Sequence, residues 1–254
     1  MSGKYLPHNV QREDRADGTI ILRSAYPLSD YVGKTGDWLD DWAVRSPEAV
    51  FIAERDGDGW REVTYAQARD MVRAIASSLL QRGLNGETPI MILSGNGVDH
   101  GLLTLAAQYV GIPTVPLAEQ YSLIPAANGQ IIHCADLVKP KLVFADDAEK
   151  YAGALALDVF SNIEKVAVRN AGAGVTDFDA LLSGDDSVDL DGAAAQVGPD
   201  TVAKYLMTSG STSSPKAVIT TQRMICANQS QIADALPFLR DHPPRIVDWL
   251  PWNH

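Results

Sequence analysis

The sequence predicts an α/β fold in which a mostly parallel sheet is flanked by helices and preceded by an early β-hairpin. Short apolar runs alternate with amphipathic segments, and this order is typical of right-handed βαβ units. The run 89–93 is apolar throughout, as expected of a strand buried on both faces. The hairpin is indicated by the turn residues 56–59, which separate the strand-like runs 49–55 and 60–65.

Residues 1–34 are interpreted as an N-terminal arm that precedes the main domain. Residues 1–17 are expected to be poorly ordered or to lie along the surface, whereas residues 18–24 contain an apolar run that can form a short strand. Thr35 is then expected to cap a helix, because the apolar side chains that follow it would share one helix face.

The clearest predicted helix follows the hairpin. Thr64 and Gln67 have the spacing of a capping box, and Gly83 is expected to end the helix. Residues 169–200 are rich in Ala, Gly and Asp, and are read as a surface connection with one short helix near 178–182, or as a domain linker. The other expected elements are strands at 113–117, 141–145, 165–168, 202–207 and 217–221, and helices at 98–110, 120–133 and 152–160.

Composition and charge exclude several classes of protein. The 254 residues include 21 Lys and Arg against 32 Asp and Glu, a formal net charge of −11, which argues against a general nucleic-acid or anionic-membrane binder. Residues 1–18 lack the apolar core of a signal peptide, and no apolar stretch is long enough to span a membrane. Cys134 and Cys226 form neither a disulfide framework nor a zinc ligand set. We therefore expect a cytoplasmic protein that binds neither nucleic acid nor membrane.

One loop has a composition suited to a polyphosphate. It lies between two β-favouring runs, its hydroxyl groups are donors, Gly210 permits close backbone approach, and Lys216 supplies a positive charge. An ordinary Ser-rich turn is the alternative from composition alone. The candidate phosphate-binding residues are Thr208, Ser209, Gly210, Ser211, Thr212, Ser213 and Lys216.

This loop does not have the pattern of a Walker phosphate loop. Pro215 stands where the second Gly belongs and lacks the N–H that a phosphate cradle needs, and Ala217 replaces the Ser or Thr that binds magnesium. The β-branched residues that follow predict a second strand, not a helix. The turn 95–97 similarly lacks the third Gly of a dinucleotide-binding fingerprint and is interpreted as an ordinary strand-to-helix turn.

Four segments, in order, resemble one family. The stretch 205–216 resembles the phosphate-loop signature of the adenylate-forming enzymes, which include acyl-CoA synthetases, aryl-CoA ligases, adenylation domains and luciferases. Val63-Thr64-Tyr65, the stretch 105–117 and the stretch 249–254 resemble other segments of this family, and the resemblance covers about residues 35–254. The sequences of the loop 208–216 and of the last residues look closest to those of bacterial feruloyl-CoA synthetases.

The resemblance implies a two-step ligase that uses ATP, Mg²⁺ and coenzyme A. A carboxylate attacks the α-phosphorus of ATP to give an acyl-adenylate, and the thiol of coenzyme A then displaces AMP. The acid is expected to be aromatic, a hydroxycinnamate such as ferulate. The loop 208–216 would hold the β- and γ-phosphates, and Trp252, Asn253 and His254 would border the acyl pocket. A terminal residue without such a role is the alternative for His254, and Trp249 and Trp252 are expected to be core side chains.

Two departures from the family pattern matter. Ser213 stands where the family usually has Gly, and Ala217 where it often has Gly. A Ser in a left-handed conformation would distort or stiffen the loop, whereas a Ser with negative φ would be neutral. A catalytically silent nucleotide- or partner-binding module is therefore an alternative. The adenylation lysine and the C-terminal domain are expected beyond His254. Residues 35–254 are thus interpreted as the truncated N-terminal portion of the AMP-binding domain, expected to be inactive alone. Exposed apolar surface would favour self-association into a homodimer.

Overall fold

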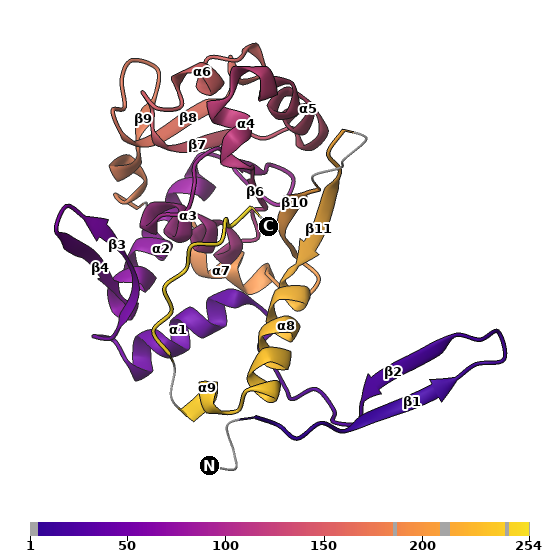
Figure 1. Ribbon diagram of the computed structural model, residues 1–254. Coiled ribbons are helices and arrows are strands. Elements are labelled where there is room, and N and C mark those ends of the chain that lie inside the picture. Colours follow the sequence, from indigo (N-terminus) through magenta and orange to yellow (C-terminus); the bar gives the residue numbers. More distant parts are fainter. Residues whose placement is uncertain (1–4, 185–186, 209–213, 242–243, 254) are drawn as a thin grey trace.

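A seven-stranded sheet forms the centre of the molecule in the computed structural model, which describes residues 5–184, 187–208, 214–241 and 244–253 (Figure 1). The strand order is β11-β10-β6-β5-β7-β8-β9. All neighbouring pairs are parallel except β10 and β11, which are antiparallel. This confirms the predicted mostly parallel sheet. The strands are β5 (Ile90–Ile92), β6 (Thr114–Pro116), β7 (Leu142–Asp147), β8 (Glu164–Arg169), β9 (Thr176–Asp177), β10 (Val202–Met207) and β11 (Ala217–Thr221).

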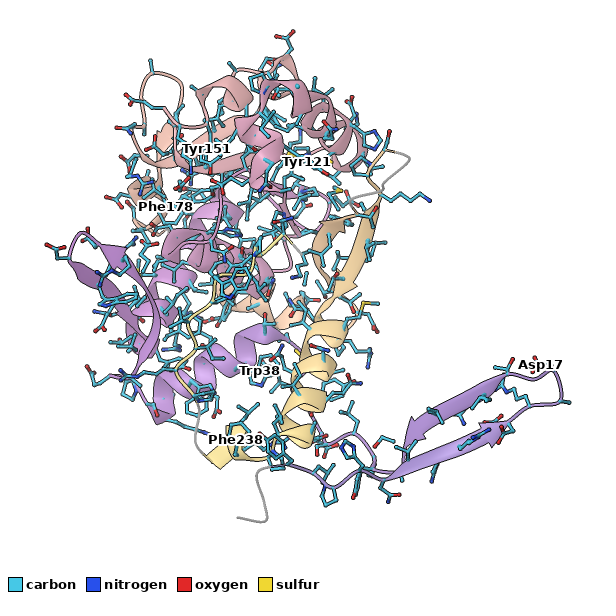
Figure 2. All side chains as sticks on the ribbon, in the orientation of Figure 1. Asp17, Trp38, Tyr121, Tyr151, Phe178 and Phe238 are labelled. Atoms are coloured by element: carbon cyan, nitrogen blue, oxygen red, sulfur yellow. The ribbon has the colours of Figure 1, made fainter. Side chains whose placement is uncertain are left out.

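Helices cover both faces of the sheet, because the side chains of its central strands alternate between two apolar clusters. Ile90 and Ile92 of β5 pack with α2 (Tyr65–Gln81) and α3 (Val98–Tyr109), whereas Met91 packs with α5 (Asn128–Val138) on the opposite face. The fully buried Phe178 and Tyr151 belong to these two clusters, respectively (Figure 2). The helices α1 (Thr35–Arg45), α4 (Glu119–Leu123) and α6 (Ala152–Leu155) complete the two layers.

The capping box of α2 is confirmed. The backbone N–H of Gln67 donates to Thr64 Oγ1 at 3.3 Å, and the backbone N–H of Thr64 donates to Gln67 Oε1 at 2.9 Å. The predicted cap at Thr35 is wrong. Lys34 occupies the N-cap position, and the Thr35 hydroxyl instead donates to Gln108 Oε1 of α3 at 3.0 Å. A buried tertiary partner therefore outcompetes the local capping role at this position.

Several element boundaries differ from the sequence-based expectation. The helix expected at 120–133 is divided into α4 and α5 by the 3-10 turn Pro125–Ala127, because proline cannot continue an α-helix. The helix expected at 152–160 is limited to α6 and the 3-10 turn Asp158–Phe160. The connection 169–200 also contains β9 and α7 (Leu190–Gln196), beside the expected short helix, a 3-10 turn at Phe178–Leu181.

Two helices follow the sheet that the sequence analysis did not identify. Helix α8 (Gln222–Ala235) begins directly after β11, where the Thr221 hydroxyl accepts from the Met224 N–H at 3.4 Å. Helix α9 (Phe238–Asp241) follows it. Among the described residues, no helix is both long enough and apolar enough to cross a bilayer.

Two antiparallel hairpins precede α2 and differ in their surroundings. The predicted hairpin is β3 (Val50–Asp56) with β4 (Gly59–Thr64). The N-terminal arm contains a second hairpin, β1 (Val10–Asp14) with β2 (Ile20–Ser24), so the expectation of a poorly ordered segment is wrong for β1. This second hairpin projects away from the body of the molecule, with Asp17 near its tip (Figures 1 and 2).

The β3–β4 hairpin is tied to the start of α3 by charged side chains. The Arg61 guanidinium donates to both carboxylate oxygens of Asp99, at 2.6 and 2.7 Å, and to Glu54 Oε1 at 3.0 Å. Glu54 Oε2 in turn accepts from the Val98 N–H at 2.9 Å. Because Asp99 is largely buried, this bidentate pair fixes the hairpin against the helix more firmly than an exposed pair would.

Candidate active site at the carboxyl edge of the sheet

The candidate site lies where β5, β6 and β10 end. In open α/β sheets, ligands bind at the carboxyl ends of the parallel strands. A pocket of about 250 Å³ lies at the ends of β5 and β6 and is lined by both polar and apolar residues. Ser94, Gly95 and Asn96 follow β5, Glu119 and Gln120 follow β6, and Asn253 belongs to the C-terminal segment.

The predicted phosphate-binding loop joins β10 to β11, as expected for a hairpin rather than a strand-to-helix loop. Its two ends are held together because the Thr208 N–H donates to the Lys216 carbonyl at 2.9 Å, and the Lys216 N–H donates to Thr208 Oγ1 at 3.1 Å. Thr208 and Lys216 are both exposed, so the Lys216 ammonium and the proton of the Thr208 hydroxyl can meet a ligand. Ser209, Gly210, Ser211, Thr212 and Ser213 lie outside the described residues.

Helix α5, on the sheet face opposite α2 and α3, contributes a histidine that contacts this hairpin. His133 of α5 lies with Nε2 at 2.8 Å from the carbonyl oxygen of Pro215. Since a carbonyl only accepts, His133 must carry a proton on Nε2 to form this hydrogen bond. Pro215 is itself buried, so this contact fixes the backbone directly before Lys216. No local sequence signal indicates this contact, because the two residues are 82 positions apart.

The segment 244–253 returns to the sheet edge and is held there by Asn96. The Asn96 side-chain amide donates to the Leu250 carbonyl at 2.7 Å, and its oxygen accepts from the Trp252 N–H at 2.9 Å. Trp252 Nε1 also donates to Asp248 at 2.8 Å, and this hydrogen bond lowers the pKa of the Asp248 carboxyl. Trp249 is 82% exposed, so the expectation that it is a core residue is wrong.

Trp252 forms part of the wall between the polar pocket and a larger one. Its indole lies edge-on to the His100 ring, with centroids 5.1 Å apart and an interplanar angle of 72°. Gly101 permits this approach, because a Cβ there would lie 3.0 Å from Ile52 and 3.5 Å from the Trp252 ring. His100, Pro116 and Trp252 line both pockets.

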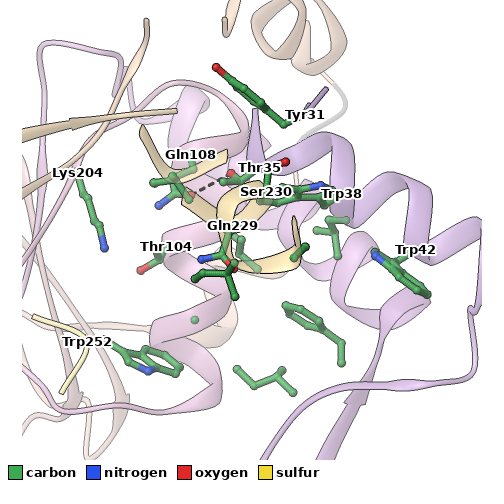
Figure 3. Close-up of a pocket in the computed structure, with 18 of the residues that line it drawn as sticks. Tyr31, Thr35, Trp38, Trp42, Thr104, Gln108, Lys204, Gln229, Ser230 and Trp252 are labelled. Atoms are coloured by element: carbon green, nitrogen blue, oxygen red, sulfur yellow. Dashed lines mark hydrogen bonds between the residues drawn. The ribbon is translucent and has the colours of Figure 1, made fainter. Parts of the chain in front are cut away.

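The larger pocket has a volume of about 810 Å³ and is mainly apolar. It lies between α1, α3, α8 and the sheet, on the side where α2 and α3 pack (Figure 3). Its size is sufficient for a ligand of drug-like dimensions. Its aromatic lining residues are Tyr31, Trp38, Trp42, Phe51, Tyr65, His100 and Trp252.

A few polar groups face this pocket, and burial changes their protonation. Burial lowers the pKa of His100, whose Nδ1 lies 2.9 Å from the Gly95 carbonyl, and the charge of Lys204 lowers it further. Burial also lowers the pKa of Lys204. The hydroxyls of Thr104 and Thr114 are buried and have no hydrogen-bond partner among the described residues. Lys204 interrupts an otherwise uncharged strand, a sequence signal that could have identified it.

The donors at the loop fit an anionic ligand better than a resident metal ion. Thr208 and Lys216 supply a hydroxyl and an ammonium group, which bind phosphate oxygens. Within the described part of the chain, no group of three or more His, Cys, Asp or Glu side chains could hold a metal.

The chain matches one protein family and several curated relatives. The model of the family "AMP-binding enzyme" matches residues 39–254. Hybrid PKS-NRPS synthetase mycA of Thermothelomyces thermophilus is 31% identical over 218 residues, covering 84% of this chain and 5% of the relative. The 4-coumarate–CoA ligase 4 of Arabidopsis thaliana is 24% identical over 219 residues, covering 85% of this chain and 37% of the relative. The chain thus spans a minor part of the length of these relatives.

Solved structures share the fold. The crystal structure of a fatty acyl-adenylate ligase from L. pneumophila, in complex with acyl adenylate and pyrophosphate, superposes with a TM-score of 0.60 at 18% identity. The match covers 79% of this chain and 32% of that chain. At this level of identity the likeness establishes the architecture, and the chemistry has to be argued from the residues of this chain.

Proposed function

Because this chain belongs to the AMP-binding enzyme family, we propose that the protein activates a small aromatic carboxylic acid with ATP and transfers it to coenzyme A. One observation carries the proposal: a hairpin ending in hydroxyl and ammonium groups lies at the sheet edge, where a polar pocket adjoins an apolar pocket of about 810 Å³. Phosphates and an apolar acyl group need these two environments next to each other.

We propose that residues 35–254 are the N-terminal portion of the AMP-binding domain. ATP supplies the AMP group that turns the carboxylate into an acyl donor for the thiol of coenzyme A. The loop 208–216 binds the β- and γ-phosphates, with Lys216 offsetting their charge and Thr208 donating from its hydroxyl. The nucleotide would bring Mg²⁺ with it. The residues that complete the reaction would lie in a longer protein, so the 254-residue chain alone is expected to be inactive.

The acid is proposed to be a hydroxycinnamate such as ferulate. Aromatic side chains dominate the larger pocket, and they pack well against a flat aromatic ring. Trp252 and Asn253 lie between the pocket and the sheet edge, where they would border the carboxylate end of the acid. His254, which lies outside the described residues, is proposed to belong to the same border. The name of the 4-coumarate–CoA ligase relative supports this class of substrate.

We also propose a location and an assembly for the protein. Cys134 and Cys226 are buried thiols on different elements, as expected in the reducing cytoplasm. Exposed apolar side chains, including those of Leu22, Ile246 and Trp249, would favour a homodimer. Sedimentation velocity over a range of protein concentrations measures this directly, and a monomer at every concentration would contradict it.

The activity is tested by acid-dependent exchange of pyrophosphate into ATP, measured with the longer protein that contains this chain. Ferulate and 4-coumarate should stimulate exchange, and hexanoate should not. Lys216→Met should lower kcat about 100-fold, because it removes a charged group that stabilises the developing phosphate charge. Lys141→Met is the matched control, because Lys141 is an exposed lysine at the opposite edge of the sheet. If ATP binds but no acid stimulates exchange, the protein is a silent nucleotide-binding module instead.

A further inference from the structure

Lys204 is a charged residue whose ammonium group has no partner among the described residues. It is the charged residue of β10, is half-buried, and extends into the apolar pocket (Figure 3). The Lys204 side chain makes no hydrogen bond or ion pair with the described residues, and the two other charged lining residues, Asp30 and Arg240, do not pair with it. Burying an unpaired ammonium group costs free energy, and none of the described residues offsets this cost at Lys204.

Two further donors that lack partners lie around the same pocket. Thr114 of β6 is paired with Lys204 in the sheet register, so the two side chains project from neighbouring strands. Thr104 of α3 lies on the same side of the pocket as Lys204 in Figure 3. Both threonine Oγ1 atoms are buried and have no partner among the described residues. A ligand oxygen that accepts hydrogen bonds could satisfy the ammonium and these hydroxyls together.

These donors are separated from the phosphate loop by a defined length of strand. Lys204 precedes Thr208 by four residues, and at about 3.3 Å per residue this spans about 13 Å. One aromatic ring with a short spacer to its carboxylate can bridge most of this distance. Such a ligand would place its carboxylate near the loop and the opposite edge of its ring near Lys204.

We propose that Lys204, assisted by Thr104 and Thr114, binds an oxygen substituent on the edge of the acid's aromatic ring that lies opposite the carboxylate. The group recognised is a phenolic oxygen, which accepts a charge-assisted hydrogen bond from the ammonium. Lys204 therefore determines specificity: it favours hydroxylated ring acids over the same acids without the hydroxyl, because the latter leave a buried cation unpaired. This inference rests on the proposed function in assigning the acid to the apolar pocket.

The experiment compares 4-coumarate with cinnamate, which differ only in the ring hydroxyl. Steady-state pyrophosphate exchange with the longer protein gives kcat/KM for each acid. The native protein should prefer 4-coumarate by about 10- to 100-fold, as expected for a hydrogen bond to a charged group. In Lys204→Met, a side chain of similar length without charge, the preference should fall to about 1, through a higher KM for 4-coumarate and an unchanged or lower KM for cinnamate.

Two further variants separate specificity from general damage. Lys216→Met carries the same substitution on the same hairpin, and it should lower activity with both acids equally, leaving their ratio unchanged. Thr104→Val should reduce the ratio part of the way. If Lys204→Met retains the native ratio of kcat/KM for 4-coumarate to kcat/KM for cinnamate, the proposed role of Lys204 is overturned. The same holds if the variant lowers kcat/KM equally for both acids.

A binding measurement distinguishes failure of this inference from failure of the proposed function. Isothermal titration calorimetry with 4-coumarate and cinnamate reports binding without any chemistry. If no acid supports pyrophosphate exchange, the proposed function fails; selective binding of 4-coumarate that is lost in Lys204→Met would still support the recognition site. If the native protein binds both acids equally, the recognition site is refuted even where exchange occurs.

Discussion

The two pockets on either side of Trp252 are built in different ways. The polar pocket of about 250 Å³ is formed by residues that directly follow strands β5 and β6, with the C-terminal segment over them. The apolar pocket of about 810 Å³ is formed by helices from both ends of the chain, including α1, α3 and α8. One wall of three residues, His100, Pro116 and Trp252, serves both.

This difference shows how one sheet edge can serve two chemical environments. Strand ends bring backbone and polar groups together because neighbouring parallel strands terminate at the same edge. Helix faces bring apolar side chains together because they must cover the sheet. Trp252 fits the boundary, since its ring packs against His100 and Gly101 while its N–H reaches Asp248.

Loss of the contacts that hold Trp252 in the shared wall should affect both pockets. Asn96→Ala removes the two hydrogen bonds, of 2.7 and 2.9 Å, that hold Leu250 and Trp252 at the sheet edge. We expect the Trp252 amide to exchange its hydrogen about 10-fold faster, and acid binding to weaken, because both pockets lose the same side. Asn96→Asp keeps the acceptor for Trp252 and should have a smaller effect. Unchanged exchange in Asn96→Ala would show that the segment is held by other contacts.

A substitution at His133 should affect the polar side alone. His133→Ala removes the hydrogen bond to the Pro215 carbonyl, which positions the backbone before Lys216. We expect the KM for ATP to rise about 3- to 10-fold, as for loss of one hydrogen bond, while the KM for the acid stays unchanged. Ile132→Ala, at an exposed neighbour on the same helix, is the control. A rise in the KM for the acid instead would mean that the two pockets are coupled through the hairpin.

His100 in the shared wall should make a small contribution to the pH dependence of the free energy of unfolding. Burial lowers the pKa of His100 below its ordinary value of 6.5, so the folded protein resists protonation that the unfolded chain accepts. The free energy of unfolding should therefore fall as pH drops from about 7 to about 5, and His100→Gln should flatten this fall. Urea unfolding at several pH values measures it, with His8→Gln, at an exposed histidine, as the control. If the free energy of unfolding falls with pH as steeply in His100→Gln as in the native protein, His100 is not the group responsible.

The parts of the fold that depend on local contacts were predictable from the sequence. The capping box of α2 joins residues three apart, and the β3–β4 turn joins adjacent strands, so the pattern of side chains suffices to identify both. The division of the helix at Pro125 was also visible in the sequence and was missed. The hairpin context of the proposed phosphate-binding loop followed from the β-branched residues after Lys216.

Contacts between residues far apart in the sequence could not be predicted from local patterns. Asn96 meets Leu250 and Trp252 across 154 and 156 residues, and nothing in its local pattern indicates those contacts. Thr35 looks like a helix cap, but its hydroxyl bonds to Gln108 once α1 packs on α3. Lys204 was visible as a charge within an apolar strand, whereas the unpartnered threonines around its pocket appear only in the folded chain.

The Glu54 contact at the start of α3 has a consequence for where a nucleotide can bind. The turn from β5 into α3 is the position at which related α/β folds use the positive end of a helix to attract phosphate. Here the Glu54 carboxylate already accepts from the Val98 N–H, and Asp99 in the first turn is paired with Arg61, which also contacts Glu54. The protein thus occupies this helix end with its own carboxylate, and a phosphate group would have to displace Glu54 to accept from the same N–H.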